Sequence, residues 1–249
     1  MRTLVFALFF LSFAAASVAQ NQPDWTYQGK TGTLNWGKLS PAYRACAKGR
    51  EQSPVDMRSA RLNTGLQPIE FHYKAGPVTL ANTGRTVAVT MNPGSYIVTG
   101  GVRYDLVSYE FHHPSEHTLK GDFSDMEIDM FHRSADGKLA ILAVRLSEGD
   151  AGFPNATLAT LWQHLPMNAG QTSKVTDMVN PGGLLPPDHS YLTYMGSLLE
   201  PPCTEGVRWF VFQQQVSISR RQYNTFADLY PMNTRPVQSL NGRKIEAIE

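Results

Sequence analysis

The sequence predicts a mainly β protein whose strands pair in an antiparallel sheet. Between residues 66 and 105, apolar and polar positions alternate, and short turn signals interrupt the alternation. This two-residue period is typical of strands that bury one face. Short strands separated by turn signals favour antiparallel pairing, because tight turns can join them. The expected strands in this region span residues 69–73, 78–80, 86–89 and 96–98.

Residues 1–19 have the pattern of a secretory signal peptide. One basic residue, Arg2, precedes an apolar run from Leu4 to Ala16, and small residues then supply a cleavage site. The apolar run is too short to span a membrane. We therefore expect cleavage after residue 19, export to a periplasm or the cell exterior, and no membrane insertion of the mature chain.

The mature chain, residues 20–249, has the length of a single β-rich domain. The formal net charge of the whole sequence is +1, and no run of like charges occurs. A nucleic acid or an anionic membrane is therefore not an expected partner. A small-molecule ligand or a protein partner remains, and the sequence leaves the oligomeric state open.

The sequence contains two cysteines, Cys46 and Cys203. In an exported protein, two cysteines predict a single disulfide, here one that closes a long loop. In the chain-entropy model such a disulfide stabilises the fold by about 4 to 5 kcal/mol. The alternative is a pair of buried free thiols.

Three further segments have local patterns that predict their structure. Residues 25–57 are rich in glycine, proline and aromatic side chains without a sustained period, which predicts an irregular wrap and neither helix nor sheet. Residues 137–146 form an apolar run that predicts a strand, with Arg145 as an unusual charged member. Residues 154–164 place leucines and a tryptophan at helical spacing and predict a short helix.

The stretch 106–132 contains the residues with the clearest chemistry. Two alternating runs, separated by a turn at Gly121, predict a pair of neighbouring strands. Side chains alternate between the two faces of a strand, so Glu110 and His112 share one face. When the strands pair, Asp129 of the second run can join them. One imidazole and two carboxylates at one point indicate a candidate metal site.

Several further segments have distinctive sequences: Asn35-Trp36-Gly37, Gln52-Ser53-Pro54-Val55-Asp56, Pro114-Ser115-Glu116-His117-Thr118, Met126-Glu127, Gly196-Ser197-Leu198-Leu199-Glu200-Pro201-Pro202, Cys203-Thr204-Glu205-Gly206 and Asn233-Thr234-Arg235-Pro236-Val237-Gln238. These segments resemble the α-carbonic anhydrases, and the resemblance covers nearly all of the mature chain. It implies one large, twisted, mostly antiparallel central sheet with a few short peripheral helices. It also implies reversible hydration of carbon dioxide, a zinc cofactor and a bridge between Cys46 and Cys203.

Carried over residue by residue, the resemblance places several functional positions of the family on altered side chains. The three zinc histidines fall on Glu110, His112 and Asp129, so one of the three is a histidine. The proton-shuttle histidine falls on Arg85. The threonine that orients the zinc-bound hydroxide falls on Leu199, with Glu200 beside it. Three supporting positions are retained, namely the partner of the orienting threonine and two residues behind the zinc ligands: Glu116, His117 and Glu127.

These substitutions predict that ordinary zinc-hydroxide catalysis is lost. Two carboxylates in place of imidazoles cancel much of the charge of zinc and raise the pKa of its bound water. Leu199 cannot accept the hydrogen bond of a hydroxide, and Arg85 does not release its proton near neutral pH. We therefore expect a binding or structural module that keeps the family fold.

Two alternatives keep an enzymatic role. The first is a weak or recast hydratase that holds another divalent metal on Glu110, His112 and Asp129. Carboxylates suit manganese, iron(II), magnesium or calcium better than they suit zinc alone, so the cofactor is one of these ions or none. The second is hydrolysis of esters, which the resemblance also allows.

The expected pocket contains several carboxylates, whose negative charges must be balanced. Glu110, Asp129 and Glu200 would approach one another there, and ionised carboxylates at close range repel unless they are paired or protonated. Three solutions are open: a bound cation, an ion pair with Arg85 or another basic side chain, or a carboxyl that keeps its proton. The retained polar residues behind the pocket either support a working site or form a buried network that the fold requires.

Overall fold

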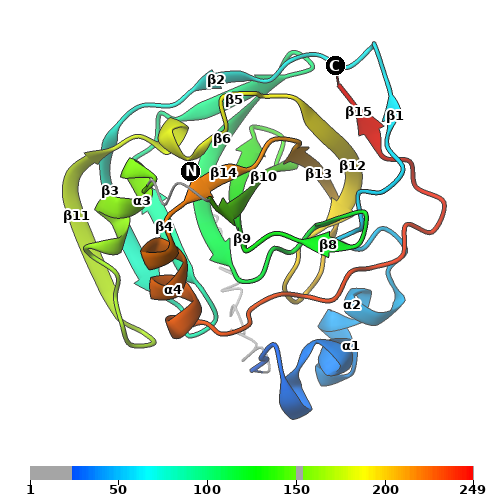
Figure 1. Ribbon diagram of the computed structural model, residues 1–249. Helices are drawn as coiled ribbons and strands as arrows, with labels where there is room; N and C mark the ends of the chain where they lie inside the picture. Colours follow the sequence, from blue (N-terminus) through cyan, green and yellow to red (C-terminus); the bar gives the residue numbers. More distant parts are fainter. Residues whose placement is uncertain (1–23, 150–153, 249) are drawn as a thin grey trace, which may run out of the picture.

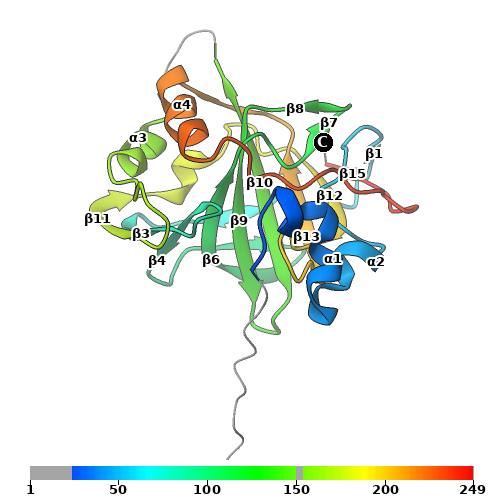
Figure 2. The same cartoon turned by 90° about the horizontal axis from the view of Figure 1, so that it is seen from below.

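The computed structural model describes residues 24–149 and 154–248, which form one large sheet with short helices packed beside it (Figures 1 and 2). The expected signal peptide, residues 1–19, lies outside the described residues. The α-helices are α1 (Trp36–Leu39), α2 (Ala45–Lys48), α3 (Ala156–Trp162) and α4 (Arg220–Leu229). The strands are β1 (Arg61–Leu62), β2 (Glu70–His72), β3 (Gly76–Asn82), β4 (Val87–Met91), β5 (Tyr96–Thr99), β6 (Val102–His112), β7 (Thr118–Leu119), β8 (Asp122–Phe123), β9 (Met126–Ser134), β10 (Leu139–Glu148), β11 (Thr172–Val179), β12 (Tyr191–Ser197), β13 (Glu205–Phe212), β14 (Val216–Ile218) and β15 (Glu246–Ala247).

The main sheet has 13 strands, and its longest path runs β1-β15-β12-β13-β10-β9-β6-β4-β3-β11. The four strands predicted between residues 69 and 98 are present as β2 to β5, and the expected strand pair and the run that follows it are present as β6, β9 and β10. Most neighbours are antiparallel, as predicted, whereas β10 pairs in parallel with both β13 and β14, and β1 pairs in parallel with β15. The predicted mainly β fold is therefore confirmed, with a sheet that is mixed at its centre and at one edge.

Strand β9 is buried on both of its faces. Its alternating side chains send Ile128 and Met130 to one face and Glu127 and Asp129 to the other, and all four are fully buried. A central strand with this pattern carries polar groups into the interior, where they must be paired by other polar groups. The candidate site lies on this polar face.

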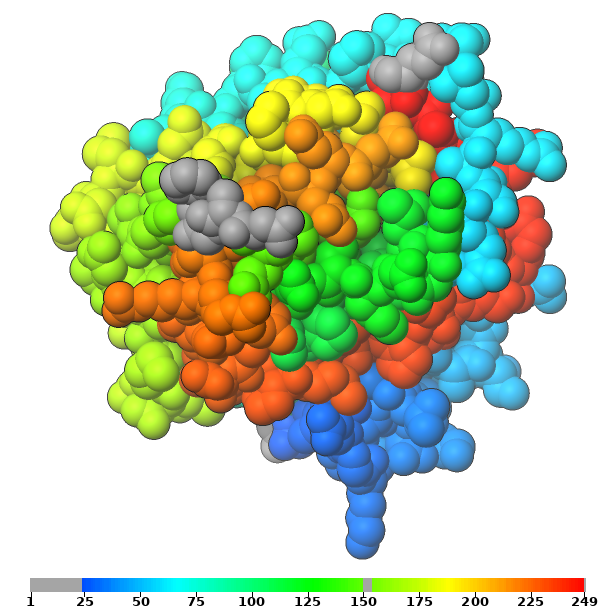
Figure 3. Space-filling model, in the orientation of Figure 1, coloured from blue at the N-terminus to red at the C-terminus, as the bar shows by residue number. Residues whose placement is uncertain are grey.

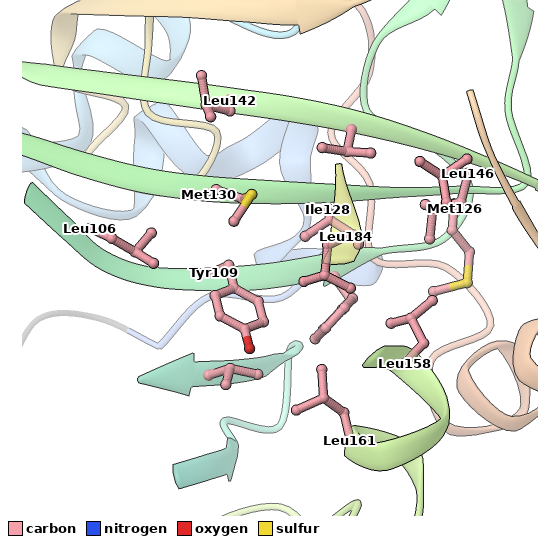
Figure 4. Close-up of a cluster of buried hydrophobic side chains, with 14 of the residues drawn as sticks. Leu106, Tyr109, Met126, Ile128, Met130, Leu142, Leu146, Leu158, Leu161 and Leu184 are labelled. Atoms are coloured by element: carbon pink, nitrogen blue, oxygen red, sulfur yellow. The ribbon is translucent and has the colours of Figure 1, made fainter. Parts of the chain in front are cut away.

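The apolar face of the central strands packs against α3. Figure 4 shows this cluster, in which side chains of β6, β9 and β10 meet leucines of the helix. Leu158 and Leu161 of α3 are fully buried there, which confirms the helix predicted from their spacing. Tight packing on this side leaves the strands little freedom, so the polar residues on the opposite face are held by a rigid support.

Two helical regions differ from the prediction. The segment 25–57 does lack long elements, but the expectation that it contains no helix is wrong, because α1 and α2 each form one helical turn. Helix α4 was not predicted, since Gln222 and Phe226 are its only buried residues among the ten. A capping box between Ser219 and Gln222 starts this helix instead of a strong apolar period.

The N-terminal wrap is fastened to the rest of the chain by a disulfide and by aromatic contacts. Cys46 and Cys203 are bonded, across a separation of 157 residues, which confirms the predicted bridge. Trp25, Tyr27 and Trp36 pack edge to face with centroid distances of 5.0 to 5.7 Å. Within residues 24–149 and 154–248, no helix is long and apolar enough to cross a membrane.

Candidate functional site

The register of β6 and β9 brings the sequence-predicted residues together on one face. Glu110 lies opposite Asp129, and His112 lies opposite Glu127. The Nε2 atom of His112 is 3.5 Å from Oδ2 of Asp129. Glu110 points into a cavity that His112 also lines. The structure therefore gathers one imidazole and several carboxylates at this point of the sheet.

The cavity beside these residues has a volume of about 140 Å³. Its polar wall is formed by Glu110, His112 and Glu200. The remaining wall is apolar and comes from β9 and from the loop after β12: Phe131, Leu198, Leu199 and Pro201. Leu199, at the position of the family's orienting threonine, is 3% exposed and presents only hydrocarbon to the cavity.

The ring of His112 is held at Nδ1, and carboxylates lie near both of its nitrogens. Nδ1 lies 2.9 Å from the backbone oxygen of Asn233, to which it donates a hydrogen bond, and 3.1 Å from Oε1 of Glu116. Nε2 faces Asp129. Burial alone would lower the pKa of His112, but the hydrogen bond to Glu116 and the charges of Glu116 and Asp129 raise this pKa well above its usual value. The neighbouring carboxylates therefore favour the protonated form of this imidazole.

Glu116, His117 and Glu127 form the buried support that the sequence predicts. Oε2 of Glu116 accepts a hydrogen bond from the backbone N–H of Arg235 at 3.0 Å. Nδ1 of His117 donates to Oε1 of Glu127 at 2.7 Å, and the backbone N–H of His117 donates to Oε2 of the same carboxylate at 3.0 Å. Burial would raise the pKa of Glu127, but its contacts with His117 lower it.

Glu110 and Glu200 are the two carboxylates that face the cavity. Burial, followed by the nearby charge of Glu200, raises the pKa of Glu110 to about 7. Burial also raises the pKa of Glu200, although His112 and a hydrogen bond from Tyr27 oppose this rise. The hydroxyl of Tyr27 donates to Oε1 of Glu200 at 3.0 Å. Glu200 is therefore close enough to Glu110 to disfavour the ionised form of Glu110.

Arg85, at the position where the resemblance places the family's proton shuttle, forms no ion pair with the cavity carboxylates, although its charge lowers the pKa of Glu200. Its guanidinium pairs with Asp24, donates to the backbone oxygen of Trp25 at 2.8 Å, and lies 4.1 Å from the ring centre of Trp25. The ion pair between Arg85 and the pocket carboxylates, one of three solutions open from the sequence, is not formed. The imidazole of His112, in contrast, lies near the carboxylates of Glu116 and Asp129.

The loop that carries Leu199 and Glu200 is anchored by the disulfide. Cys203 has a left-handed backbone, with φ of 57°, and its N–H donates to the backbone oxygen of Glu200 at 2.8 Å. A side-chain hydrogen bond from Gln52 to the backbone oxygen of Cys203 joins the loop to the N-terminal wrap. The bridge therefore fixes one wall of the cavity as well as two distant parts of the chain.

The donor set does not fit the zinc site that the resemblance implies. Within the part of the chain that the structure describes, no group of three or more histidine, cysteine, aspartate or glutamate side chains is arranged to hold a metal ion. Two of the three positions are carboxylates, Glu110 and Asp129, which would cancel much of the charge that three neutral imidazoles leave on zinc. Even so, Nε2 of His112 and both carboxylate oxygens of Asp129 lack hydrogen-bond partners among the described residues.

Three residues of the site could not be found by chemical reasoning on the strand pair. Asn233 supplies the backbone oxygen that holds His112, Arg235 supplies the N–H that holds Glu116, and Tyr27 holds Glu200. The side chain of Asn233 is fully engaged as well, with Oδ1 accepting from the N–H of His113 and Nδ2 donating to the backbone oxygens of residues 85 and 111. Resemblance to the family's N-terminal and closing segments was their only signal.

Comparison with known proteins identifies the family. The family model described as eukaryotic-type carbonic anhydrase matches residues 31–249. A carbonic anhydrase of Nostoc sp. is 36% identical over 245 residues, which cover 96% of this chain and 92% of the relative. The structure of α-carbonic anhydrase from Thermovibrio ammonificans with the inhibitor sulfanilamide has a TM-score of 0.86 at 37% identity, covering 90% of this chain and 98% of that one. A dioscorin complexed with ascorbate has a TM-score of 0.82 at 30% identity, covering 91% and 98%. The chain therefore belongs to the α-carbonic anhydrase family, the eukaryotic type in the description of the family model.

Proposed function

We propose that this chain is an exported member of the carbonic anhydrase family whose cavity binds a small molecule and does not carry out zinc-dependent hydration. The family reaction is the reversible hydration of carbon dioxide, and the scaffold for it is present. Glu110 and Asp129 stand where the resemblance places two zinc histidines, and Leu199 stands where it places the orienting threonine. The dioscorin complexed with ascorbate supports a binding role, because it shows this fold with a small organic molecule.

The position of His112 carries the proposal. Its ring lies between Glu116 and Asp129, with 3.1 Å and 3.5 Å between the facing nitrogen and oxygen atoms. Zinc binds the neutral form of an imidazole. Three neutral imidazoles leave the ion its full positive charge, which activates the water bound to it. Burial, followed by the charge of Glu127, raises the pKa of Asp129 well above its usual value, which favours a carboxyl that keeps its proton. A positively charged imidazole and a carboxyl that keeps its proton both reduce the negative charge of this site without a metal.

The test is metal analysis of protein purified without chelator, followed by stopped-flow hydration of carbon dioxide on the same sample. We expect substoichiometric zinc and no turnover above the uncatalysed rate. The triple variant Glu110→His, Asp129→His and Leu199→Thr is the matched control, because it restores the donor set that the resemblance implies, and we expect it to gain zinc. Stoichiometric zinc with turnover in the unmodified chain would overturn the proposal.

A second candidate function is hydration through another divalent metal on Glu110, His112 and Asp129. The observation in its favour is that both oxygens of Asp129 and Nε2 of His112 are buried without hydrogen-bond partners. Carboxylate-rich donor sets suit manganese, iron(II), magnesium or calcium. This candidate predicts hydratase activity that depends on the added metal and that Asp129→Ala abolishes. An unchanged rate in that variant would reject this metal site.

Export is part of the proposal because of the pattern of residues 1–19. N-terminal sequencing of the protein recovered from a periplasmic or culture fraction tests it. A new N-terminus at Gln20 is the expected result. A full-length chain that stays in the cytoplasmic fraction would contradict export without affecting the proposed role of the cavity.

A further inference from the structure

A basic segment, residues 25–50, forms the first part of the N-terminal wrap and contains five basic side chains and no acidic one. The basic residues, all exposed, are Lys30, Lys38, Arg44, Lys48 and Arg50. Within residues 24–149 and 154–248, none of these five side chains forms an ion pair or a side-chain hydrogen bond. The net charge of +1 for the whole sequence therefore conceals a local excess of positive charge.

The acidic residues that flank the basic segment interact with other cations. Asp24 is paired with Arg85. At the other end, the backbone N–H of Glu51 donates to the carboxylate of Glu205 at 2.6 Å, and Arg243 interacts electrostatically with both acidic side chains. Neither end of the segment therefore supplies an ion-pair partner for its lysines.

The basic segment is a compact unit at one edge of the molecule. Figures 1 and 2 show α1 and α2 side by side, and Figure 3 shows the same part, coloured blue, projecting from the surface. A Cβ atom added to Gly37 of α1 would lie only 2.4 Å from the Cβ atom of Ala47 in α2, so the two helical turns are in contact. The disulfide of Cys46 and the fully buried ring of Trp36 fix the unit to the domain. Its cations are therefore presented to the solvent by a rigid support.

An exposed apolar side chain lies among these cations. Leu34 is 86% exposed, and no other large apolar side chain of the described residues is exposed to that extent. Together with Gly37 and Ala47, it lines a surface pocket of about 180 Å³. Lys38 and Lys48 are the chain neighbours of those two residues, so they flank the same pocket. Exposed hydrocarbon surrounded by cations is typical of surfaces that bind the interface of an anionic bilayer.

We propose that the basic segment docks the protein on an anionic lipid bilayer, with its cations at the lipid headgroups and Leu34 inserted between them. Lysines and arginines close to an anionic membrane each add to the attraction, although the charge averaged over the whole sequence is small. Leu34 favours lipid over a polar polyanion such as a nucleic acid, because only the bilayer offers hydrocarbon to an apolar side chain.

The docking is peripheral, since none of the described helices can cross a membrane. The pocket beside Leu34 shares no residue with the cavity that Glu110 and His112 line. The inference therefore goes beyond the proposed function and does not depend on what the cavity binds.

Cosedimentation of the full mature chain with lipid vesicles tests the inference. The probe is a vesicle of phosphatidylcholine mixed with the anionic lipid phosphatidylglycerol, and vesicles of phosphatidylcholine alone are the neutral control. We expect the protein to sediment with the mixed vesicles at low salt and to stay in solution with the neutral ones. In about 1 M salt the Debye length falls to about 3 Å, so the binding should be lost.

The double variant Lys38→Gln and Lys48→Gln should weaken vesicle binding by about tenfold, because it removes two of the cations next to Leu34. The matched control is Lys74→Gln with Lys174→Gln, which removes the same charge and should leave binding largely unchanged. Lys174 belongs to β11, which lies across the molecule from α1 and α2 in Figures 1 and 2, and Lys74 lies between β2 and β3.

Leu34→Ser tests the insertion and should weaken binding by about threefold or more. Leu62→Ser is its control, because Leu62 is 56% exposed on β1 and lies outside the basic segment. Absence of binding to the mixed vesicles, equal binding to both vesicle types, or full binding by the Lys38 and Lys48 variant would each overturn the inference. A Leu34→Ser chain that binds the mixed vesicles and dextran sulfate as the unmodified chain does would assign the segment to polyanions in general and overturn the choice of lipid.

Discussion

Nε2 of His112 lies 3.5 Å from Oδ2 of Asp129, and the two residues belong to neighbouring strands of the central sheet. Because Glu116 approaches the other ring nitrogen, the imidazole is enclosed by two buried carboxylates. The contact links β6 to β9 on the face opposite the apolar cluster. The same two strands thus meet through hydrocarbon on one side and through buried polar groups on the other.

Asp129→Asn should lower the pKa of His112. Burial disfavours the imidazolium, and the carboxylate of Asp129 is one of the groups that oppose this effect. The measurement is an NMR titration of the histidine ring carbons in the unmodified chain and in the variant. Asp136→Asn, at an exposed turn, is the control and should leave the titration of His112 in place. An unchanged pKa in the Asp129 variant would show that Asp129 does not stabilise the charge.

The unfolding free energy should fall as the pH drops between about 6.5 and 4, in part because of His132. Burial lowers the pKa of His132 from 6.5 to about 4, although a hydrogen bond to the backbone oxygen of Met130 partly opposes this. The unfolded chain therefore takes up a proton at a higher pH than the folded chain does. This difference amounts to about 3 kcal/mol lost by about pH 4.

His132→Gln isolates this contribution from that of the carboxylates. Urea unfolding at about pH 7 and about pH 4.5 gives the pH dependence of each protein. Tyr73 donates to Nε2 of His132 at 2.8 Å, and glutamine keeps an acceptor in reach of that hydroxyl. The variant should lose less stability than the unmodified chain between the two pH values. Equal losses would contradict the assignment to His132.

The double variant Cys46→Ser and Cys203→Ser should be less stable by about 5 kcal/mol in the chain-entropy model. Because 157 positions separate the two cysteines, the disulfide closes a long loop. Its removal therefore increases the conformational entropy of the unfolded chain. Urea unfolding in the absence of reductant measures the loss. Adding reductant should destabilise the unmodified chain and leave the variant as it was. A loss well below 1 kcal/mol would indicate that the wrap is held by its other contacts.

Gly196→Ala should destabilise the fold by about 1 to 3 kcal/mol or more, because the site has no room for a methyl group. A Cβ atom at this position would lie 2.1 Å from Oγ of Ser53 and 2.9 Å from Cδ1 of Trp209. Thermal unfolding measures the effect. Gly76→Ala is the control, since its Cβ would meet nothing closer than 3.8 Å. Equal melting temperatures for the two variants would show that the residues around Gly196 shift enough to accommodate the methyl group.

The strand pair at the site could be predicted because its signal is local. Alternation in the stretch 106–132 assigns each side chain to a face, and the apolar positions decide which face meets the core. Glu110 opposite Asp129 follows from that pattern once the strands pair. The charged state of His112 did not follow, because it depends on Glu116 and on a backbone oxygen in a distant segment.

Contacts between distant segments explain most of what was missed. Tyr27 and Glu200 are 173 residues apart, and nothing in their own neighbourhoods indicates the hydrogen bond between them. Helix α4 shows the reverse case. Its start is marked locally by Ser219 and Gln222, but its mostly exposed surface lacks the apolar period from which a helix is predicted. Sequence patterns indicate which side chains are buried. They rarely indicate polar contacts between residues that are far apart in the sequence.

The hydrogen bond from His112 to the backbone of Asn233 also has a consequence for the order of folding. The two residues are 121 positions apart, so during synthesis β6 is complete long before its partner segment exists. Strands β3 and β4 can pair as soon as both have emerged, because a short turn separates them. Contacts between remote positions close slowly. We therefore expect the polar centre to be among the last parts of the molecule to form, and its charged groups to stay in contact with water until then.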